Sequence, residues 1–243
     1  MTLGIALSPS KIKEYPEFPT YQSGYTWRET FHRTTLTPTD WPILWNTAVV
    51  ATGTVTLDTN EAIRVGAATN LTSDVADAWM TNISLRLETI SINRAFSPKL
   101  PSKYKVTMQF QTNSAANVKA FVGIINNFTG IGALPTTARH CGIQIDTTAS
   151  ANWFTTSANG TSQVTEDTAV AGSTALLYAV ITVNGSDSAT IELVDSTGSV
   201  LYTDTVTALS HGSQSLTPHI YSETLTTSAK NFDCEIVEIN WFD

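Results

Sequence analysis

The sequence predicts an all-β protein, arranged as an antiparallel β-sandwich. Ser and Thr make up about a quarter of the 243 residues, and charged residues only 14%. This composition suits the exposed faces of β-strands, where Thr is favoured, better than it suits helices. From Trp27 onward, short runs of β-type residues alternate with turn residues. So many short strands predict a sandwich or jelly roll, and a chain of this length can form one as a single domain.

Residues 1–26 are predicted to form an extended arm ahead of this domain. They hold three prolines and three tyrosines but no apolar periodicity, a pattern typical of extended chain. A segment that cannot bury itself gains order by lying across a partner, and tyrosines offer large contact areas at small rotamer cost. We therefore expect an arm over residues 1–26, anchored by Tyr15, Tyr21 and Tyr25, and a sandwich domain over residues 27–243.

The clearest single strand is predicted at residues 103–111. There Tyr104, Val106, Met108 and Phe110 alternate with polar residues. This alternation indicates a half-buried strand with one wet face.

Residues 176–206 are predicted to form consecutive antiparallel strands. The turns Asn184-Gly185 and Ser196-Thr197-Gly198 are short and separate alternating runs, as expected of hairpins. The other predicted strands, in chain order, span residues 27–35, 43–57, 62–67, 81–90, 120–125, 141–146, a run about Trp153, 218–225 and 232–242.

The net charge of −8 lies in one segment. Between His140 and Ala229 there are eight acidic residues and no lysine or arginine, whereas the rest of the chain holds thirteen basic and thirteen acidic residues. Nucleic-acid binding needs basic side chains that displace counterions from phosphates. We therefore expect no nucleic-acid partner.

The N-terminus and the cysteines both indicate synthesis in the cytosol. The stretch MTLGIAL has no basic region and only a short apolar run, so we expect neither a signal peptide nor a membrane span. Cys141 and Cys234 share strand parity with apolar neighbours, which favours buried free thiols over a disulfide. The only other Cys or His within a few residues of either cysteine is His140, which would face the opposite side, so no zinc site is predicted.

An ordered series of segments in the later part of the chain resembles a known family. The series is AFVGIINNFTGIG at 120–132, GIQIDTTASANWFTTSANGT at 142–161, a hairpin with an acidic turn at 164–172, AVITVNGSDSATIELVDSTGSVL at 179–201 and LTPHIYSETLTTSAKNFDCEIVEINWF at 216–242. In this order the segments resemble the concanavalin A-like, laminin-G-like jelly-roll domains of tailed-virus structural proteins. The resemblance covers residues 104–243 and, more loosely, 27–103. It implies a concanavalin A-like jelly roll and a role in a virion.

The same fold hosts glycan hydrolases and lyases, which place carboxylates at alternate positions of one strand. The comparable cluster here is Asp233, Glu235 and Glu238. Asp233 and Glu235 share a face, but Val237 and Ile239 continue that parity, so Glu238 falls on the other side unless a bulge intervenes. The chain also has no Gly-x-Ser-x-Gly elbow and no His-Glu-x-x-His motif. We therefore expect no catalytic site.

Calcium is an open alternative to a metal-free protein. Laminin-G-like folds sometimes bind it at a loop rim, where Asp146 with Asn152, or Asp187 with Asp195, would offer oxygen ligands. Against this, the chain has no dense Asp/Asn run, and isolated turn aspartates usually cap their own backbone. The prediction is accordingly no metal and no cofactor.

The six tryptophans allow two interpretations, sugar stacking or packing in the core and at interfaces. Packing is favoured because Trp buries a large area. Trp153 is the exception, since it follows a polar loop and heads the FTTSANGTS segment, where an exposed ring would reach a ligand. Trp153 and Asn152 are therefore the candidate glycan-binding residues.

Together these features predict a non-enzymatic structural protein of a virion, made in the host cytoplasm. The first hypothesis is a capsid decoration or head-fibre protein, which the arm attaches to a capsid or tail subunit and which groups as a homotrimer. The alternative is a carbohydrate-binding module of a tail fibre or host-adhesion appendage, bound to a host surface glycan; a polysaccharide hydrolase is the third. An exposed aromatic patch on one concave sheet face would favour sugar binding, and a purely Ser/Thr face would favour decoration.

Overall fold

The computed structural model describes residues 26–29, 44–50, 53–57, 63–67, 75–81, 103–126, 138–184, 187–207, 209, 216–226 and 230–241. The strands before residue 103 are described by their backbone. All regular structure in these residues is β-strand, which confirms the predicted fold class. None of the described residues belongs to a helix long and apolar enough to cross a membrane. The arm predicted over residues 1–26, with its three tyrosines, lies outside the described residues except for Thr26.

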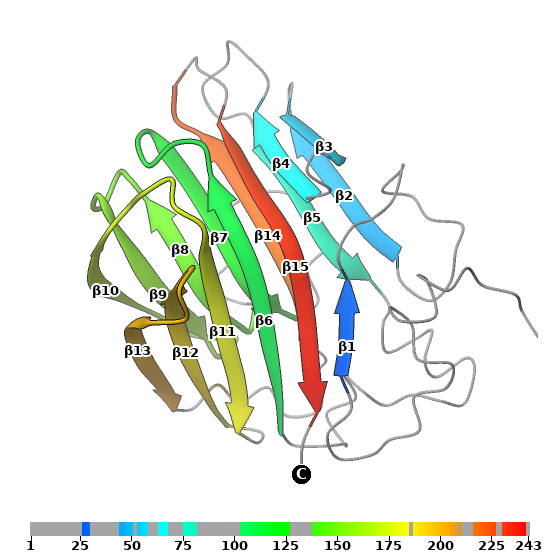
Figure 1. The fold of residues 1–243 in the computed structure, drawn as a ribbon, viewed down its shortest axis with the longest axis vertical. Helices are drawn as coiled ribbons and strands as arrows, with labels where there is room; N and C mark the ends of the chain where they lie inside the picture. Colours follow the sequence, from blue (N-terminus) through cyan, green and yellow to red (C-terminus); the bar gives the residue numbers. More distant parts are fainter. Residues whose placement is uncertain are drawn as a thin grey trace, which may run out of the picture.

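The strands form two antiparallel sheets stacked face to face (Figure 1). In chain order they are β1 (Thr26–Glu29), β2 (Leu44–Val50), β3 (Gly53–Leu57), β4 (Ile63–Ala67), β5 (Val75–Thr81), β6 (Lys103–Thr112), β7 (Val118–Ile125), β8 (His140–Asp146), β9 (Asn152–Ala158), β10 (Gln163–Ala171), β11 (Leu177–Asn184), β12 (Ser188–Asp195), β13 (Val200–Thr207), β14 (Thr217–Thr224) and β15 (Asn231–Trp241). The eight-stranded sheet has the order β13-β12-β11-β6-β15-β4-β3, with β1 also paired to β15. The seven-stranded sheet has the order β10-β9-β8-β7-β14-β5-β2.

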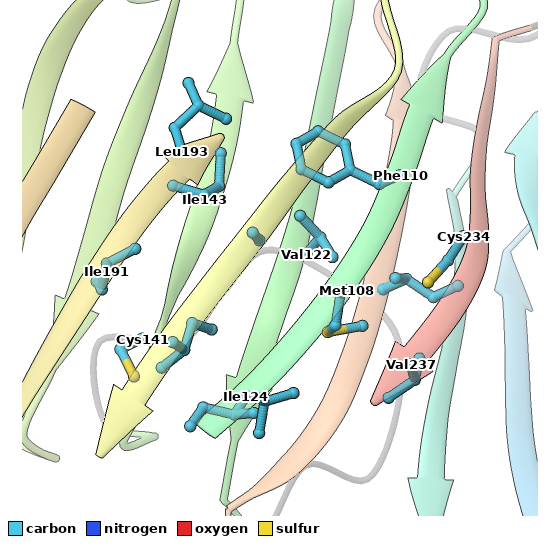
Figure 2. Close-up of a cluster of buried hydrophobic side chains, with 14 of the residues drawn as sticks. Met108, Phe110, Val122, Ile124, Cys141, Ile143, Ile191, Leu193, Cys234 and Val237 are labelled. Atoms are coloured by element: carbon cyan, nitrogen blue, oxygen red, sulfur yellow. The ribbon is translucent and has the colours of Figure 1, made fainter. Parts of the chain in front are cut away.

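The hydrophobic core fills the space between the two sheets. Alternation along each strand sends every second side chain inward, so the apolar residues predicted to be buried at 103–111 lie in it. Figure 2 shows the two sides of this core, with Met108, Phe110, Ile191 and Leu193 from the eight-stranded sheet and Val122, Ile124, Cys141 and Ile143 from the seven-stranded sheet.

Both cysteines are buried free thiols, as the sequence predicts. Cys141 belongs to β8 and Cys234 to β15, and neither side chain has exposed surface. Burial raises the pKa of the Cys141 thiol, so that thiol stays protonated and unreactive at neutral pH.

The predicted strands at 176–206 are confirmed, because β11, β12 and β13 pair in sequence as antiparallel neighbours. Two other predictions are wrong. The run predicted at 43–57 is two strands, β2 and β3, which lie in different sheets, and a change of sheet leaves no mark on residue alternation. The hairpin predicted at 164–172 is the single strand β10, which pairs with β9.

Candidate functional site

The outer face of the seven-stranded sheet carries a row of aromatic and amide side chains. Residues paired in register on neighbouring strands point to the same face. Tyr221 of β14 pairs with Phe121 of β7, and Phe121 pairs with Gln144 of β8. Gln144 in turn pairs with Phe154 of β9. The four side chains therefore follow one another across the sheet, on the face turned away from the core.

A pocket of about 340 Å³ lies along this row. Its volume falls within the range of small-ligand sites, which combine apolar walls with a few polar groups. The side chains that define its chemistry come from β7, β8, β9, β10 and β14 and are Lys119, Phe121, Gln144, Asp146, Phe154, Gln163, Thr165 and Tyr221.

Two glycines let the Phe121 ring lie flat against the sheet. A Cβ at Gly123 would stand 2.6 Å from Cζ of Phe121, and a Cβ at Gly142 would stand 2.7 Å from Cε2. These separations are shorter than any normal contact, so only glycine leaves room for the ring. Phe121 and Tyr221 consequently form an apolar cluster of their own, separate from the core, with exposures of 1% and 4%.

Two polar side chains at the pocket have no hydrogen-bond partner within the part of the chain that the structure describes. Among the described residues, neither the amide of Gln144 nor the hydroxyl of Thr165 makes a hydrogen bond, and Gln144 is only half-buried. Gln163 donates from Nε2 to Oγ1 of Thr156 at 3.0 Å, which engages its amide nitrogen. A ligand can therefore bind the Gln144 amide and the Thr165 hydroxyl without first breaking a bond within these residues.

Charged residues line one side of the aromatic row. Glu223, Lys119 and Asp146 are register partners on β14, β7 and β8. The Lys119 ammonium lies 3.6 Å from the Asp146 carboxylate. Glu223 accepts a hydrogen bond from the hydroxyl of Tyr221. Lys119 thus lies between two acidic residues, Glu223 and Asp146, and these three side chains together carry a negative charge.

A buried histidine lies next to Phe121. The ring of His140 meets the Phe121 ring edge-on, with centroids 6.0 Å apart. Its Nδ1 lies 3.0 Å from the carbonyl oxygen of Ala138, and its Nε2 lies 3.2 Å from Oγ1 of Thr156. Burial lowers the pKa of His140 to about 4, and nearby His219 acts in the same direction. The ring is therefore neutral at neutral pH.

The two residues predicted to bind a glycan have different surroundings. The expectation of an exposed Trp153 ring is wrong: the side chain is 1% exposed and packs edge-on against Phe110 in the core, 5.4 Å between centroids. Strand parity explains this, because Trp153 pairs with the core residue Ile145. Asn152 is half-buried and donates from Nδ2 to the carboxylate of Asp167 at 2.8 and 3.1 Å. Its role toward a glycan stays a prediction.

The aspartates considered for calcium cap backbone turns. Asp146 accepts hydrogen bonds from the backbone and hydroxyl of Thr148 at 2.9 and 2.5 Å. Asp195 accepts hydrogen bonds from Thr197 and from the backbone of Ser199. These bonds hold the pKa of the Asp195 carboxyl below its ordinary value, and the bond from the Thr197 hydroxyl contributes most. In the part of the chain that the structure describes, no three His, Cys, Asp or Glu side chains group in a way that could hold a metal ion.

The carboxylates considered for hydrolysis lie on the other sheet. A register shift between Cys234 and Ile236 interrupts β15, and this bulge reverses the parity assumed from the sequence. Cys234, Val237 and Ile239 are buried on one side, whereas Asp233 and Glu238 are partly exposed on the opposite one. Glu238 there accepts a hydrogen bond from Nδ2 of Asn240 at 2.9 Å.

The pocket residues were missed because only strand pairing brings them together. Phe121 and Gln144 lie in strands that the sequence predicts, and alternation alone indicates that Gln144 points away from its apolar neighbours. What alternation lacks is the register that aligns β7, β8, β9 and β14. One sequence signal was available: Gly123 follows Phe121 by two residues on the same face, and a glycine there leaves room for the ring to lie on the sheet.

No protein-family model and no curated protein sequence matches the chain. Solved structures do match it at low identity. Peanut lectin, solved with a 9mer peptide, superposes with a TM-score of 0.58 at 11% identity, over 90% of this chain and 97% of that one. The CBM2 module of the evolved Dit of Lactobacillus casei BL23 phage J-1 gives 0.54 at 13% identity, over 90% and 97%.

A third structure comes from work on endo-acting O-glycanases of human gut microbiota that initiate mucin breakdown. It superposes with a TM-score of 0.59 at 9% identity, over 89% of this chain and 99% of that one. The chain has a lectin-like jelly-roll fold. This confirms the concanavalin A-like architecture that the sequence resemblance implied, and at these identities the likeness shows the fold alone.

Proposed function

We propose that this lectin-like protein binds a glycan in the pocket on the outer face of its seven-stranded sheet. The observation that carries the proposal is one pocket that combines Phe121, Phe154 and Tyr221 with the polar groups of Gln144 and Thr165, for which the described residues offer no hydrogen-bond partner. The three rings are largely buried and give the pocket an apolar wall against which a sugar face can pack. The amide and the hydroxyl can pair with sugar hydroxyls. The lectin and the phage Dit module among the similar structures support the same role.

This proposal reverses the order of the two hypotheses drawn from the sequence. The outer face is not a purely Ser/Thr one, because three aromatic side chains line the pocket. They are at most 9% exposed and so do not form the exposed patch expected for sugar binding, and the support comes from the pocket itself and its polar groups. A virion location remains part of the proposal, with the arm attaching a homotrimer to a capsid or tail subunit. The order of the sequence segments and the likeness to a phage Dit module support that location.

We further propose that the pocket binds without catalysis. Glycoside hydrolases use two carboxyl groups on either side of the scissile bond. Among the described residues, Asp146 is the one acid that lines the pocket, and it is engaged by Lys119 and Thr148. This arrangement supports a binding protein over a hydrolase.

The test is a screen on an array of neutral and acidic glycans, followed by affinity electrophoresis in gels that contain the polysaccharides retained. Gln144→Ala should weaken binding by about tenfold, the effect of losing a well-placed hydrogen bond at the site. Gln111→Ala is the matched control, because Gln111 is an exposed glutamine on the other sheet. Absence of binding to every glycan, or equal affinity of the two variants, would count against the proposal.

A further inference from the structure

A chain of hydrogen bonds runs from the buried His140 to the pocket wall. His140 contacts the Ala138 carbonyl through Nδ1 at 3.0 Å and the Thr156 hydroxyl through Nε2 at 3.2 Å. The same hydroxyl accepts a hydrogen bond from Nε2 of Gln163 at 3.0 Å. His140 and Thr156 are fully buried, whereas Gln163 is half-buried and lines the pocket.

Chemistry fixes the direction of every bond in this chain. A backbone carbonyl only accepts, so Nδ1 of His140 carries the hydrogen. Because burial lowers the pKa of His140 to about 4, the neutral ring then has a bare Nε2, which accepts from the Thr156 hydroxyl. A hydroxyl has a single hydrogen. Thr156 can therefore meet Gln163 only as an acceptor, and the amide nitrogen of Gln163 must face it.

The orientation of the Gln163 amide is the consequence at the pocket. With Nε2 held by Thr156, the carbonyl oxygen Oε1 is left without a partner among the described residues. An unconstrained glutamine would present either its oxygen or its nitrogen to a ligand. Here the buried histidine selects the oxygen, and the pocket gains a fixed acceptor.

We infer that His140, acting through Thr156, holds Gln163 as a hydrogen-bond acceptor and thereby makes this pocket specific for an uncharged sugar that donates a hydroxyl or amide hydrogen to Oε1 of Gln163. The inference rests on the proposed function and names the ligand class of the same site. His140 and Thr156 are positioning residues, since neither lines the pocket.

The charges at the pocket argue for a neutral ligand. Among the described residues, Lys119 is the one cation that lines the pocket, and it is already paired with Asp146. Glu223 and Asp146 flank Lys119 in register and leave that row with an acidic excess. A carboxylate or sulfate on a sugar would meet this excess and the Gln163 carbonyl oxygen, both of which repel an anion.

The hydrogen-bond chain is tested first in the unliganded protein by NMR. The ring nitrogens of His140 should show hydrogen on Nδ1 and none on Nε2. The side-chain amide protons of Gln163 should exchange with water more slowly than those of Gln144, which has no partner among the described residues. Thr156→Val should abolish the difference, and Thr156→Ser, which keeps the hydroxyl, should retain it. Hydrogen on Nε2, or unchanged exchange in Thr156→Val, would overturn the inference.

Binding is tested by affinity electrophoresis at neutral pH against soluble mannan, galactan and β-glucan as neutral probes and polygalacturonate and hyaluronate as acidic ones. The protein should be retarded by a neutral probe and not by the acidic ones. Thr156→Val should weaken that binding by about tenfold, and Thr156→Ser by less than about twofold.

A double-mutant cycle separates positioning from a general structural effect. If Thr156 acts only through Gln163, then Thr156→Val has no further effect on affinity once Gln163→Leu is present. Additive losses would show that Thr156 supports the pocket in another way and would overturn the inference.

Stronger binding to an acidic probe would overturn the ligand class. If NMR shows the hydrogen-bond chain but no probe binds, both the ligand assignment and the proposed function are refuted. If a neutral probe binds but the hydrogen-bond chain is absent, the inference fails and the proposed function stands.

Discussion

His140 is the residue whose burial links the stability of this protein to pH. It has no exposed surface, and its ring nitrogens meet the Ala138 carbonyl and the Thr156 hydroxyl. A neutral imidazole satisfies both contacts, because it carries one donor and one acceptor nitrogen. A protonated ring would have two donors and would force Thr156 to turn its hydrogen away. Burial favours the uncharged form and outweighs the hydrogen bond to the Ala138 carbonyl, which by itself favours the charged ring.

The free energy of unfolding should fall between about pH 6.5 and pH 4 because of this residue. Folding lowers the pKa of His140 from 6.5 to about 4, so in this window the unfolded chain binds a proton that the folded protein does not. The stabilisation is fully present above pH 6.5 and is lost as the pH falls, with a total on the order of 3 kcal/mol. Urea unfolding at a series of pH values measures it. The His140→Gln variant should show a shallower slope over the same range, and equal slopes would refute the assignment to His140.

The edge strands β10 and β13 lie at the same end of the two sheets (Figure 1). Polar contacts connect the sheets there, beside apolar side chains such as Val206. Asp204 of β13 accepts a hydrogen bond from the buried hydroxyl of Thr155 at 2.8 Å. Tyr202 donates its hydroxyl to Glu166 of β10 at 3.3 Å. Asp204 pairs with the core residue Ile191 and so faces inward, and an inward charge on an edge strand discourages pairing with further strands.

Replacing Asp204 should reveal the contribution of that contact. Asp204→Ala leaves the buried hydroxyl of Thr155 without its acceptor and should lower the free energy of unfolding by about 1–2 kcal/mol. Asp204→Asn keeps an acceptor oxygen and should cost less. In a Thr155→Val background the Asp204→Ala penalty should shrink, since no hydroxyl is left unpaired. Chemical denaturation of the four variants measures these differences, and equal losses for Ala and Asn would contradict the explanation.

Strand prediction succeeded where turns are short and local. The Asn184-Gly185 turn and the turn at 196–198 identify β11, β12 and β13, because each strand pairs with its sequence neighbour. It failed where the chain changes sheet or a bulge shifts the register. The bulge in β15 places Asp233 and Glu238 on the same face although they differ in sequence parity, and the positive φ of Ala169 marks a similar irregularity in β10. One inserted residue exchanges the two faces of a strand, which alternation along the sequence cannot detect.

At the scale of the whole molecule, the fold was predictable and the pocket was not. Composition, alternation and segment order were enough for a lectin-like sandwich. The pocket requires five strands in register, with β14 placed beside β7 although about a hundred residues separate them in the chain. The tryptophan chosen from the sequence lies in the core, while the smaller rings of Phe121 and Phe154 line the pocket. Trp153 was chosen because it follows a polar loop, whereas its strand pairing with the core residue Ile145 places it inside the sandwich.

The division of the chain into an arm and a folded domain leads to a prediction about the whole protein. The pocket is formed by β7–β10 and β14, and β1 begins at Thr26 and pairs with β15 on the other sheet. Deleting residues 2–25 should therefore leave both the melting temperature and the affinity for glycan nearly unchanged, because no described strand is shortened.

If Tyr15, Tyr21 and Tyr25 anchor the protein to a capsid or tail subunit, the same deletion should abolish its incorporation into particles. Thermal unfolding, affinity electrophoresis and the protein content of purified particles measure the three quantities. Gln144→Ala is the matched control, since it should impair glycan binding and leave incorporation intact. Normal occupancy of particles by the truncated protein would show that attachment runs through the folded domain.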